Sequence, residues 1–347
     1  LVSLCYKKLS MSKKNSNVLN LKNLITKDKI ILNTYSLFKK SIGNYKKKKL
    51  VAAISGGPDS LALAGLLKIL EHEKKTKVFY VLVDHSIRMS SQNEAQKVKI
   101  LLKKHKISLK ILKNKKKIDR NIQSIAREVR YELLSGFCKK NNINHILTAH
   151  HRDDQVETFL IRLSRGSGVQ GLSGMDLTSS LNKRIKIIRP LLDCKKENLI
   201  YVAKKIFGKY FKDPSNKNKK YLRTKIRNLK KTLENSGLSY DQILKSIKNL
   251  SSTRDTLNKY ISSLYKENVS IKKKKILVKY DHISNETTEI QLKLFGKILK
   301  NYTKSYYPPR SKKILNLIEK LRQGKIKNLN LSGCSIQKIG SFIEIKK

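Results

Sequence analysis

Residues 55–60, Ser-Gly-Gly-Pro-Asp-Ser, place two hydroxyls, two glycines and a carboxylate between two apolar stretches. Residues 50–54 are apolar, as in a buried strand, and residues 61–67 are apolar helix formers. Glycine lets a backbone approach an anion closely, and the free N–H groups of a helix N-terminus point at it. The stretch therefore predicts a phosphate-binding loop, with an ordinary strand-to-helix turn as the alternative.

This loop differs from the P-loop of NTPases, which ends in Gly-Lys-Ser/Thr. Asp59 stands where a lysine would be expected. A carboxylate beside phosphates is favourable if it meets Mg²⁺ or a backbone N–H. We expect Mg²⁺, because this ion bridges phosphates with one or two carboxylates.

A second cluster of titratable residues occupies 149–158, Ala-His-His-Arg-Asp-Asp-Gln-Val-Glu-Thr. It follows an apolar stretch, so its histidines and acids should lie in one turn at the start of a helix. Helix capping explains part of it, since Asp154 and Glu157 have capping-box spacing and acids favour a helix N-terminus. A zinc site is disfavoured because the His-x-x-x-His spacing is missing. We expect the rest of this cluster to serve the chemistry of the site.

The elements that would position both clusters alternate between strand and helix. Strands are predicted at 50–54, 78–83, 108–112 and 145–148, with helical patterns between them. This order indicates an α/β fold with a doubly wound parallel sheet. Ligands of such sheets bind beyond the carboxyl ends of the strands, so Asp84 and His85 should face the same crevice as the loop.

Residues 122–137 show helical spacing of apolar residues, with Arg127, Arg130 and Tyr131 on the outward face. From the residues alone, these side chains form a solvated charged face.

The composition favours some classes of function and argues against others. The chain has 347 residues and a formal charge of +53, which favours a polyanionic partner, although a codon bias toward lysine explains the excess equally well. Its four cysteines form no Cys-x-x-Cys pair, which argues against zinc, iron–sulfur and disulfide frameworks. No apolar stretch has the length of a membrane span and no signal-peptide pattern is visible, so we expect a cytoplasmic protein with no membrane partner.

Residues 55–60 resemble the SGGxDS signature of the PP-loop ATP pyrophosphatases. Further blocks follow in the order found in tRNA(Ile)-lysidine synthetases, a family of that superfamily: the histidine–acid cluster at 150–158, Arg-Gly-Ser-Gly at 165–168, Arg-Pro-Leu-Leu at 189–192, Asp-Pro-Ser-Asn at 213–216 and Tyr-Leu-Arg-Thr-Lys-Ile-Arg at 221–227. The series covers about residues 51–227. Thr224 departs from it, because the family usually has asparagine there, and the region after 235 is short compared with the longest members.

The resemblance implies ATP-dependent transfer of free L-lysine to the wobble cytidine of tRNA(Ile), with ATP and Mg²⁺ required. It assigns ATP binding to Ser55, Gly56, Gly57, Pro58, Asp59, Ser60, Asp84, His85 and Arg127, with Asp59 also as the metal ligand. The resemblance assigns catalysis to Asp59, His150, Asp153, Asp154 and Glu157, and it places His150 or His151 at the α-phosphate. The residues expected at tRNA are Arg130, Arg165, Arg223 and Arg227, the last two on a helix over 219–235.

We expect three regions: an N-terminal extension at 1–47, whose true start could be Met11, a PP-loop domain at 48–235, and a helical and α+β region at 236–347 that docks tRNA or serves as a structural cap. The oligomeric state, a homodimer included, stays open. Two other functions compete. A PP-loop thiolase would need catalytic cysteines near the motifs, and a non-catalytic basic RNA-binding module would carry a degenerate loop. Lysine-dependent release of pyrophosphate separates the three.

Overall fold

The computed structural model describes residues 27–45, 48–74, 76–116, 118, 122–211, 222–272, 275–305, 308–324 and 328–347. Met11, Tyr221 and the Asp-Pro-Ser-Asn block at 213–216 lie outside these ranges. The chain divides after Ile247 into two compact units. Among the described residues, no helix has the length and apolar character that crossing a bilayer requires.

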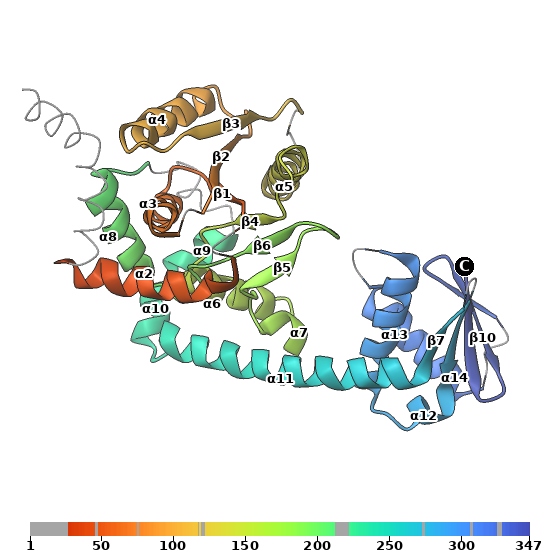
Figure 1. Cartoon of the computed structure of the whole chain (residues 1–347). Coiled ribbons are helices and arrows are strands. Elements are labelled where there is room, and N and C mark those ends of the chain that lie inside the picture. Colours follow the sequence, from red (N-terminus) through yellow and green to blue (C-terminus); the bar gives the residue numbers. More distant parts are fainter. Residues whose placement is uncertain are drawn as a thin grey trace, which may run out of the picture. The chain divides into compact units, whose positions relative to one another are not determined.

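The first unit is built on a six-stranded sheet in the order β3-β2-β1-β4-β6-β5. All neighbouring pairs are parallel except β5 with β6, which is antiparallel at the edge. The strands are β1 Leu50–Ile54, β2 Val78–Asp84, β3 Leu109–Lys113, β4 His145–Leu147, β5 Thr178–Ser180 and β6 Lys186–Ile188. The predicted doubly wound α/β fold is confirmed (Figure 1).

Helices cover both faces of this sheet, so alternate residues of β1 are buried on opposite sides. Leu50, Ala52 and Ile54 belong to the core formed with α2, α3, α4 and α8, and Val51 belongs to the core under α5. The helical elements of the unit are α2 Lys29–Ser41, η1 Gly43–Tyr45, α3 Pro58–Lys74, α4 Ser91–Lys104, α5 Ile122–Lys140, α6 Arg152–Leu163, α7 Val169–Leu172, α8 Lys196–Phe207, α9 Leu222–Asn228 and α10 Lys230–Asn235.

Helix α2 is integral to this core, since Ile31 and Phe38 are fully buried in it. Asp28 fixes its start: one carboxylate oxygen accepts from the N–H groups of Ile30 and Ile31, and the other accepts from the Tyr201 hydroxyl of α8 at 2.6 Å. A side chain thus caps one helix and ties it to another.

Helix α4 begins at Ser91, so Ser90 precedes it, and the Glu94 carboxylate accepts from the Ser90 hydroxyl. The helix expected over 219–235 is two helices, α9 and α10, with Leu229 between them. Residues 219–221 lie outside the described ranges.

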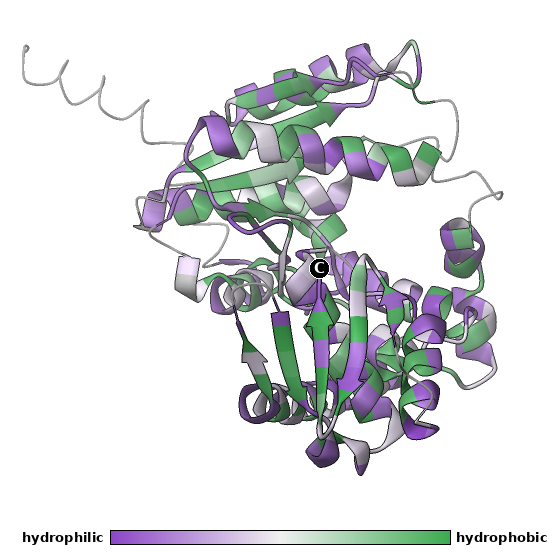
Figure 2. Ribbon diagram, turned by 90° about the vertical axis from the view of Figure 1, so that its right-hand side faces the viewer, coloured by the Kyte–Doolittle hydropathy of each residue, from purple (hydrophilic) through white to green (hydrophobic). Residues whose placement is uncertain are grey.

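The second unit contains an antiparallel sheet in the order β7-β8-β11-β10-β9, in which β10 and β11 form a hairpin. Hydrophobic and hydrophilic segments follow one another along its strands (Figure 2), as expected for a sheet with one face on a core. Its elements are β7 Val269–Ile271, β8 Lys275–Lys279, α12 Tyr280–Ser284, α13 Thr288–Thr303, α14 Ser311–Arg322, β9 Leu329–Leu331, β10 Cys334–Ile339 and β11 Phe342–Lys346.

Helix α11, Tyr240–Asn268, contributes to both units. Its buried apolar residues are divided between two cores. Ile243 and Ile247 pack with Val156 of α6 in the first unit, whereas Ile261 and Leu264 belong to the core of the second.

Candidate active site

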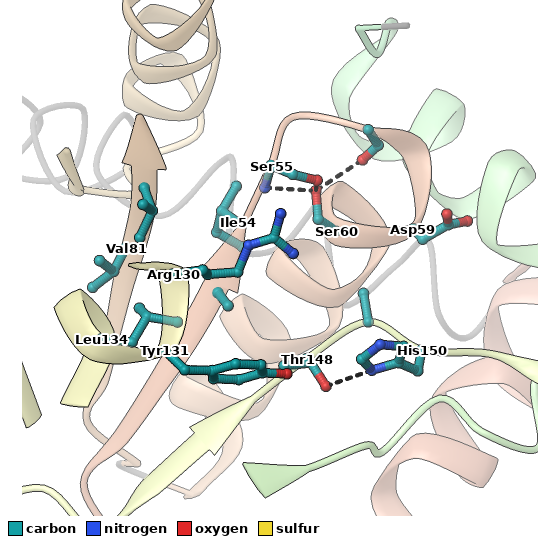
Figure 3. Close-up of a pocket in the computed structure, with 14 residues that line it drawn as sticks. Ile54, Ser55, Asp59, Ser60, Val81, Arg130, Tyr131, Leu134, Thr148 and His150 are labelled. Carbon is teal, nitrogen blue, oxygen red and sulfur yellow. Dashed lines mark hydrogen bonds between the residues drawn. The ribbon is translucent and has the colours of Figure 1, made fainter. Parts of the chain in front are cut away.

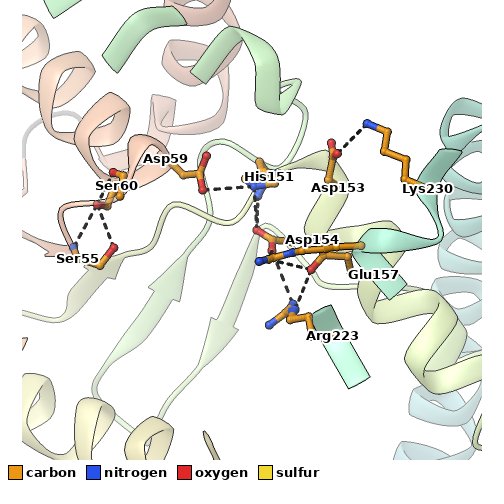
Figure 4. Close-up of polar contacts among 11 residues, drawn as sticks. Ser55, Asp59, Ser60, His151, Asp153, Asp154, Glu157, Arg223 and Lys230 are labelled. Carbon is orange, nitrogen blue, oxygen red and sulfur yellow. Dashed lines mark hydrogen bonds and ion pairs between the residues drawn. The ribbon is translucent and has the colours of Figure 1, made fainter. Parts of the chain in front are cut away.

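The loop between β1 and α3 is shaped by the hydroxyl of Ser60, which is buried. This oxygen accepts from the backbone N–H groups of Ser55 and Gly56, each at 3.1 Å, and donates to the Gly57 carbonyl at 3.0 Å. The Ser55 hydroxyl also donates to it at 3.1 Å. Ser60 is predicted to bind ATP, and in the structure its hydrogen bonds hold the curvature of the loop (Figures 3 and 4).

Gly56 is the residue of the loop that cannot carry a side chain. Its φ is +85°, and a Cβ at this position would lie 2.4 Å from Cγ2 of Val98. We expect Gly56→Ala to lower the free energy of unfolding by about 1–3 kcal/mol and to weaken nucleotide binding, since the loop must move to relieve the clash. Urea unfolding and ATP titration test this. Gly43→Ala is the matched control because its Cβ would meet nothing within 4 Å. Equal effects of both changes would contradict the assignment.

A cavity opens in front of the loop at the carboxyl ends of β1, β2 and β4 (Figure 3). Its lining has an apolar part that includes Val81, Val83 and Leu134. Its polar part includes the loop, Arg130, Tyr131, Thr148 and His150. An apolar wall beside a loop of N–H groups suits a ligand with a flat base at one end and phosphates at the other.

The acidic turn, residues 150–157, borders the same region from the start of α6. His151 is the N-cap residue of α6, and Asp154 lies in the first turn of this helix. The backbone N–H of His151 donates to Asp154 Oδ2 at 3.1 Å, so the Asp154 side chain caps the start of the helix. The capping pair is therefore one helical turn earlier than the Asp154–Glu157 spacing had indicated. Capping uses one oxygen of Asp154 and leaves the other for different partners.

His151 joins the two clusters (Figure 4). Its Nε2 lies 3.6 Å from Oδ2 of Asp59 on the loop and 3.6 Å from Oδ2 of Asp154 on the turn. Burial alone disfavours the charged ring, but Asp59 and Asp154 outweigh it and raise the pKa of His151 above its usual value. Burial raises the pKa of Asp154, but the nearby histidines and Arg223 outweigh it, so the pKa of this carboxyl is lowered. Asp59 and Asp154 thus share one site.

Glu157 is held by two guanidinium groups. Its side chain is 1% exposed, and it accepts from Arg223 Nε at 2.9 Å and from Arg227 Nε at 2.5 Å and Nη2 at 3.0 Å. Both arginines also lie 3.7 Å from Asp154 Oδ1. Arg223 and Arg227 are predicted to contact tRNA, and Glu157 is predicted to act on the reacting lysine. In the structure these three side chains pair with one another beside Asp154.

Asp153 is paired with a residue that sequence reasoning missed. Lys230 Nζ lies 3.1 Å from Asp153 Oδ2 and 4.7 Å from the centre of the Tyr240 ring. Burial opposes the charge on Lys230, but the bond to Asp153 outweighs it and raises the pKa of the amine. Lys230 follows Arg223 and Arg227 at helical spacing, which is the signal that could have identified it.

The other predicted residues are spread around the cavity. Asp84 is buried and accepts from the Ser86 N–H at 2.9 Å, so it closes the turn after β2. Arg127 stacks over Tyr131 at 5.1 Å. Arg165 is exposed beyond the end of α6 and does not line the cavity, whereas Arg130 does. The buried ring nitrogens of His85 have no hydrogen-bond partner in the described part of the chain.

His85 and His150 should make stability depend on pH. Burial is the main cause that lowers the pKa of each ring to about 4, with Arg130 adding to it at His85. The unfolded rings take up a proton near pH 6.5 and the folded rings only near 4. Stability therefore falls as the pH drops through this window, by up to about 3 kcal/mol per ring at 1.36 kcal/mol per unit. Urea unfolding between pH 7 and 4.5 tests this. His85→Gln should flatten the dependence, and an unchanged slope would contradict it.

The fold and the site together define a PP-loop protein, and residues 30–233 match the family model of the PP-loop domain. Among solved structures, the U34-tRNA thiolase NcsA from Methanococcus maripaludis with its [4Fe-4S] cluster superposes with a TM-score of 0.54 at 20% identity. The match covers 64% of this chain and 79% of that one. This likeness concerns the fold.

Two curated relatives extend over most of the chain. It is 35% identical to the tRNA(Ile)-lysidine synthase of Wolbachia pipientis wMel over 307 residues, which cover 87% of this chain and 71% of the relative. It is 33% identical to that of Wolbachia sp. subsp. Brugia malayi over 302 residues, covering 86% and 70%. The chain belongs to the tRNA(Ile)-lysidine synthase family, which confirms the resemblance found in its motifs.

Proposed function

We propose that this protein joins free L-lysine to C2 of the wobble cytidine of tRNA(Ile) with anticodon CAU. The C2 carbonyl oxygen of cytidine attacks the α-phosphorus of ATP and pyrophosphate leaves. The ε-amine of lysine then attacks C2, the C2–O bond breaks, and AMP departs with that oxygen while the amine loses a proton. The observation that carries the proposal is the shared site of the phosphate loop and the acidic turn, joined through His151.

The loop is the proposed holder of the β- and γ-phosphates, which leave together as pyrophosphate. The N–H groups of Ser55 and Gly56 donate to Ser60, so the donors would be the other backbone N–H groups of the loop and the N-terminus of α3. The adenine base would lie against Val81, Val83 and Leu134. His150, which lines the cavity, is better placed than His151 for the α-phosphate, because Nε2 of His151 lies between two carboxylates.

Magnesium fits Asp59. One oxygen of this carboxylate, Oδ1, is buried and has no hydrogen-bond partner in the described part of the chain. The described residues contain no group of three histidines, cysteines or acids that could hold a metal without further ligands. Mg²⁺ normally takes one or two carboxylates together with phosphate oxygens and water. Bound by Asp59 and ATP, the ion would neutralise charge on the departing pyrophosphate.

Lysine must lose a proton before it attacks. With an ordinary pKa near 10.4, its free amine costs about 4–5 kcal/mol at pH 7. We propose Asp153, Asp154 and Glu157 as the groups that bind lysine and handle this proton. Asp154 is the foremost of them, because the two arginines hydrogen-bond to Glu157 but lie 3.7 Å from Asp154, and Asp153 is paired with Lys230. A free lysine carries an ammonium and an α-carboxylate, and this cluster offers charges complementary to both.

For tRNA, contacts of lysine and arginine with phosphates supply affinity without sequence information. The charge of +53 supports such contacts, and we propose Arg130, Arg165 and residues 236–347 as parts of the tRNA-binding surface. The cytoplasm is the proposed location of the reaction.

Release of pyrophosphate from ATP tests the function. We expect release that requires both tRNA(Ile) and lysine. A thiolase would be indifferent to lysine, and a non-catalytic RNA-binding module would release none. Either result would refute the proposal.

A further inference from the structure

Thr148 and His150 are joined by a hydrogen bond at the edge of the cavity. Oγ1 of Thr148 lies 2.8 Å from Nδ1 of His150, and both residues line the cavity together with Ser55 and Asp59 (Figure 3). Thr148 follows the last residue of β4. Its backbone N–H donates to the carbonyl of Ile188 on β6 at 3.0 Å, so the sheet fixes its position.

The direction of this hydrogen bond follows from the partners available. Thr148 is 8% exposed, and in the described part of the chain its hydroxyl has no second hydrogen-bond partner. If Nδ1 carried the proton and donated to Oγ1, the threonine O–H would have no acceptor among the described residues. If the O–H donates to Nδ1, both groups are satisfied. The proton of the neutral ring then resides on Nε2.

A neutral ring is the form that this environment favours. Burial lowers the pKa of His150 to about 4, and the positive charges of Arg189, Arg127 and Arg223 act in the same direction against the opposing effect of Asp154. A neutral imidazole has one donor and one acceptor nitrogen. Since Nδ1 is used by Thr148, Nε2–H is the donor left for the cavity.

We propose that Thr148 is a positioning residue that selects the Nε2–H tautomer of His150, so that the neutral ring donates a hydrogen bond to the α-phosphate of ATP. The inference rests on the proposed function for its ligand, but the choice of tautomer is a property of the protein alone. A donor in this place stabilises the charge that grows on the phosphate oxygens as pyrophosphate leaves. The opposite tautomer would present a lone pair to those oxygens and repel them.

The first test is the tautomer itself. The chain has seven histidines, and ¹⁵N–¹H correlation spectra of protein labelled in the imidazole rings separate Nε2–H from Nδ1–H forms. His150→Gln assigns the signal. We expect Nε2–H in the wild-type protein and in Thr148→Ser, which keeps the hydroxyl, and a populated Nδ1–H form in Thr148→Val, which has nearly the same shape without it. A wild-type Nδ1–H ring, or identical spectra for wild type and Thr148→Val, would overturn the proposal.

The second test is activity. Thr148→Val should lower kcat for lysidine formation about tenfold, the effect of one hydrogen bond, with little change in the KM for lysine, and Thr148→Ser should restore most of it. If serine is as impaired as valine, the hydroxyl has no such role and the positioning is refuted. A wild-type protein that forms no lysidine would refute the proposed function, and the spectra would still decide the tautomer.

Discussion

Asp154→Asn is expected to reduce the turnover of lysidine formation about a thousandfold while tRNA binding stays unchanged. Asparagine retains an oxygen that can accept from the His151 N–H, so the start of α6 keeps its cap. The substitution removes the charge proposed to hold the ammonium of lysine and the base proposed to receive its proton. Arg223, Arg227 and His151 would each lose a carboxylate partner as well, which makes the site less favourable for a cationic substrate.

The measurement is single-turnover formation of lysidine beside a tRNA-binding titration at the same salt concentration. Asp193→Asn is the matched control, because Asp193 is an exposed aspartate of the same unit, and it should leave both quantities unaltered. Near-normal turnover of Asp154→Asn would remove this carboxylate from the mechanism.

Glu157→Gln is expected to cost about 3–5 kcal/mol of folding free energy, because it leaves two guanidinium groups beside a buried amide. The glutamate side chain is almost fully buried, so water cannot replace the lost charge. Burial opposes the charged form of Arg227, and its bond to Glu157 outweighs this and raises its pKa. Activity should fall too, since α9 would no longer be held against α6.

Urea unfolding of Glu157→Gln, Arg227→Gln and the double variant gives the coupling directly. Glu132→Gln is the control: this glutamate pairs with Lys116 on the surface, where such a pair contributes about 0–1 kcal/mol. A loss at Glu157 no larger than at Glu132 would show that the buried cluster does not stabilise the fold.

The phosphate loop and the parallel sheet could be predicted because their signals are local. An apolar strand, two glycines and a helix start lie within about twenty consecutive residues, and the same succession recurs along the first half of the chain. Strands β5 and β6 could not be found in this way. Each has three residues, too few for a period of two to stand out.

The partners of the acidic turn could not be predicted from one sequence. Arg223, Arg227 and Lys230 lie 66 to 77 positions from the carboxylates they bind, and charged residues on a predicted helix most often face solvent. The hydrogen bonds of Ser60 within the loop could not be predicted for a different reason. A hydroxyl in a phosphate loop can bind the ligand or the loop itself, and the local sequence is the same in both cases.

The most direct test of the central claim is the mass of the wobble nucleoside after tRNA(Ile) has been incubated with this protein, ATP and isotopically labelled lysine. The account predicts a nucleoside heavier by one lysine less one water, with the label in it, and no such product when lysine, ATP or Asp59 is removed. An unmodified cytidine, or a thiolated nucleoside in its place, would contradict it.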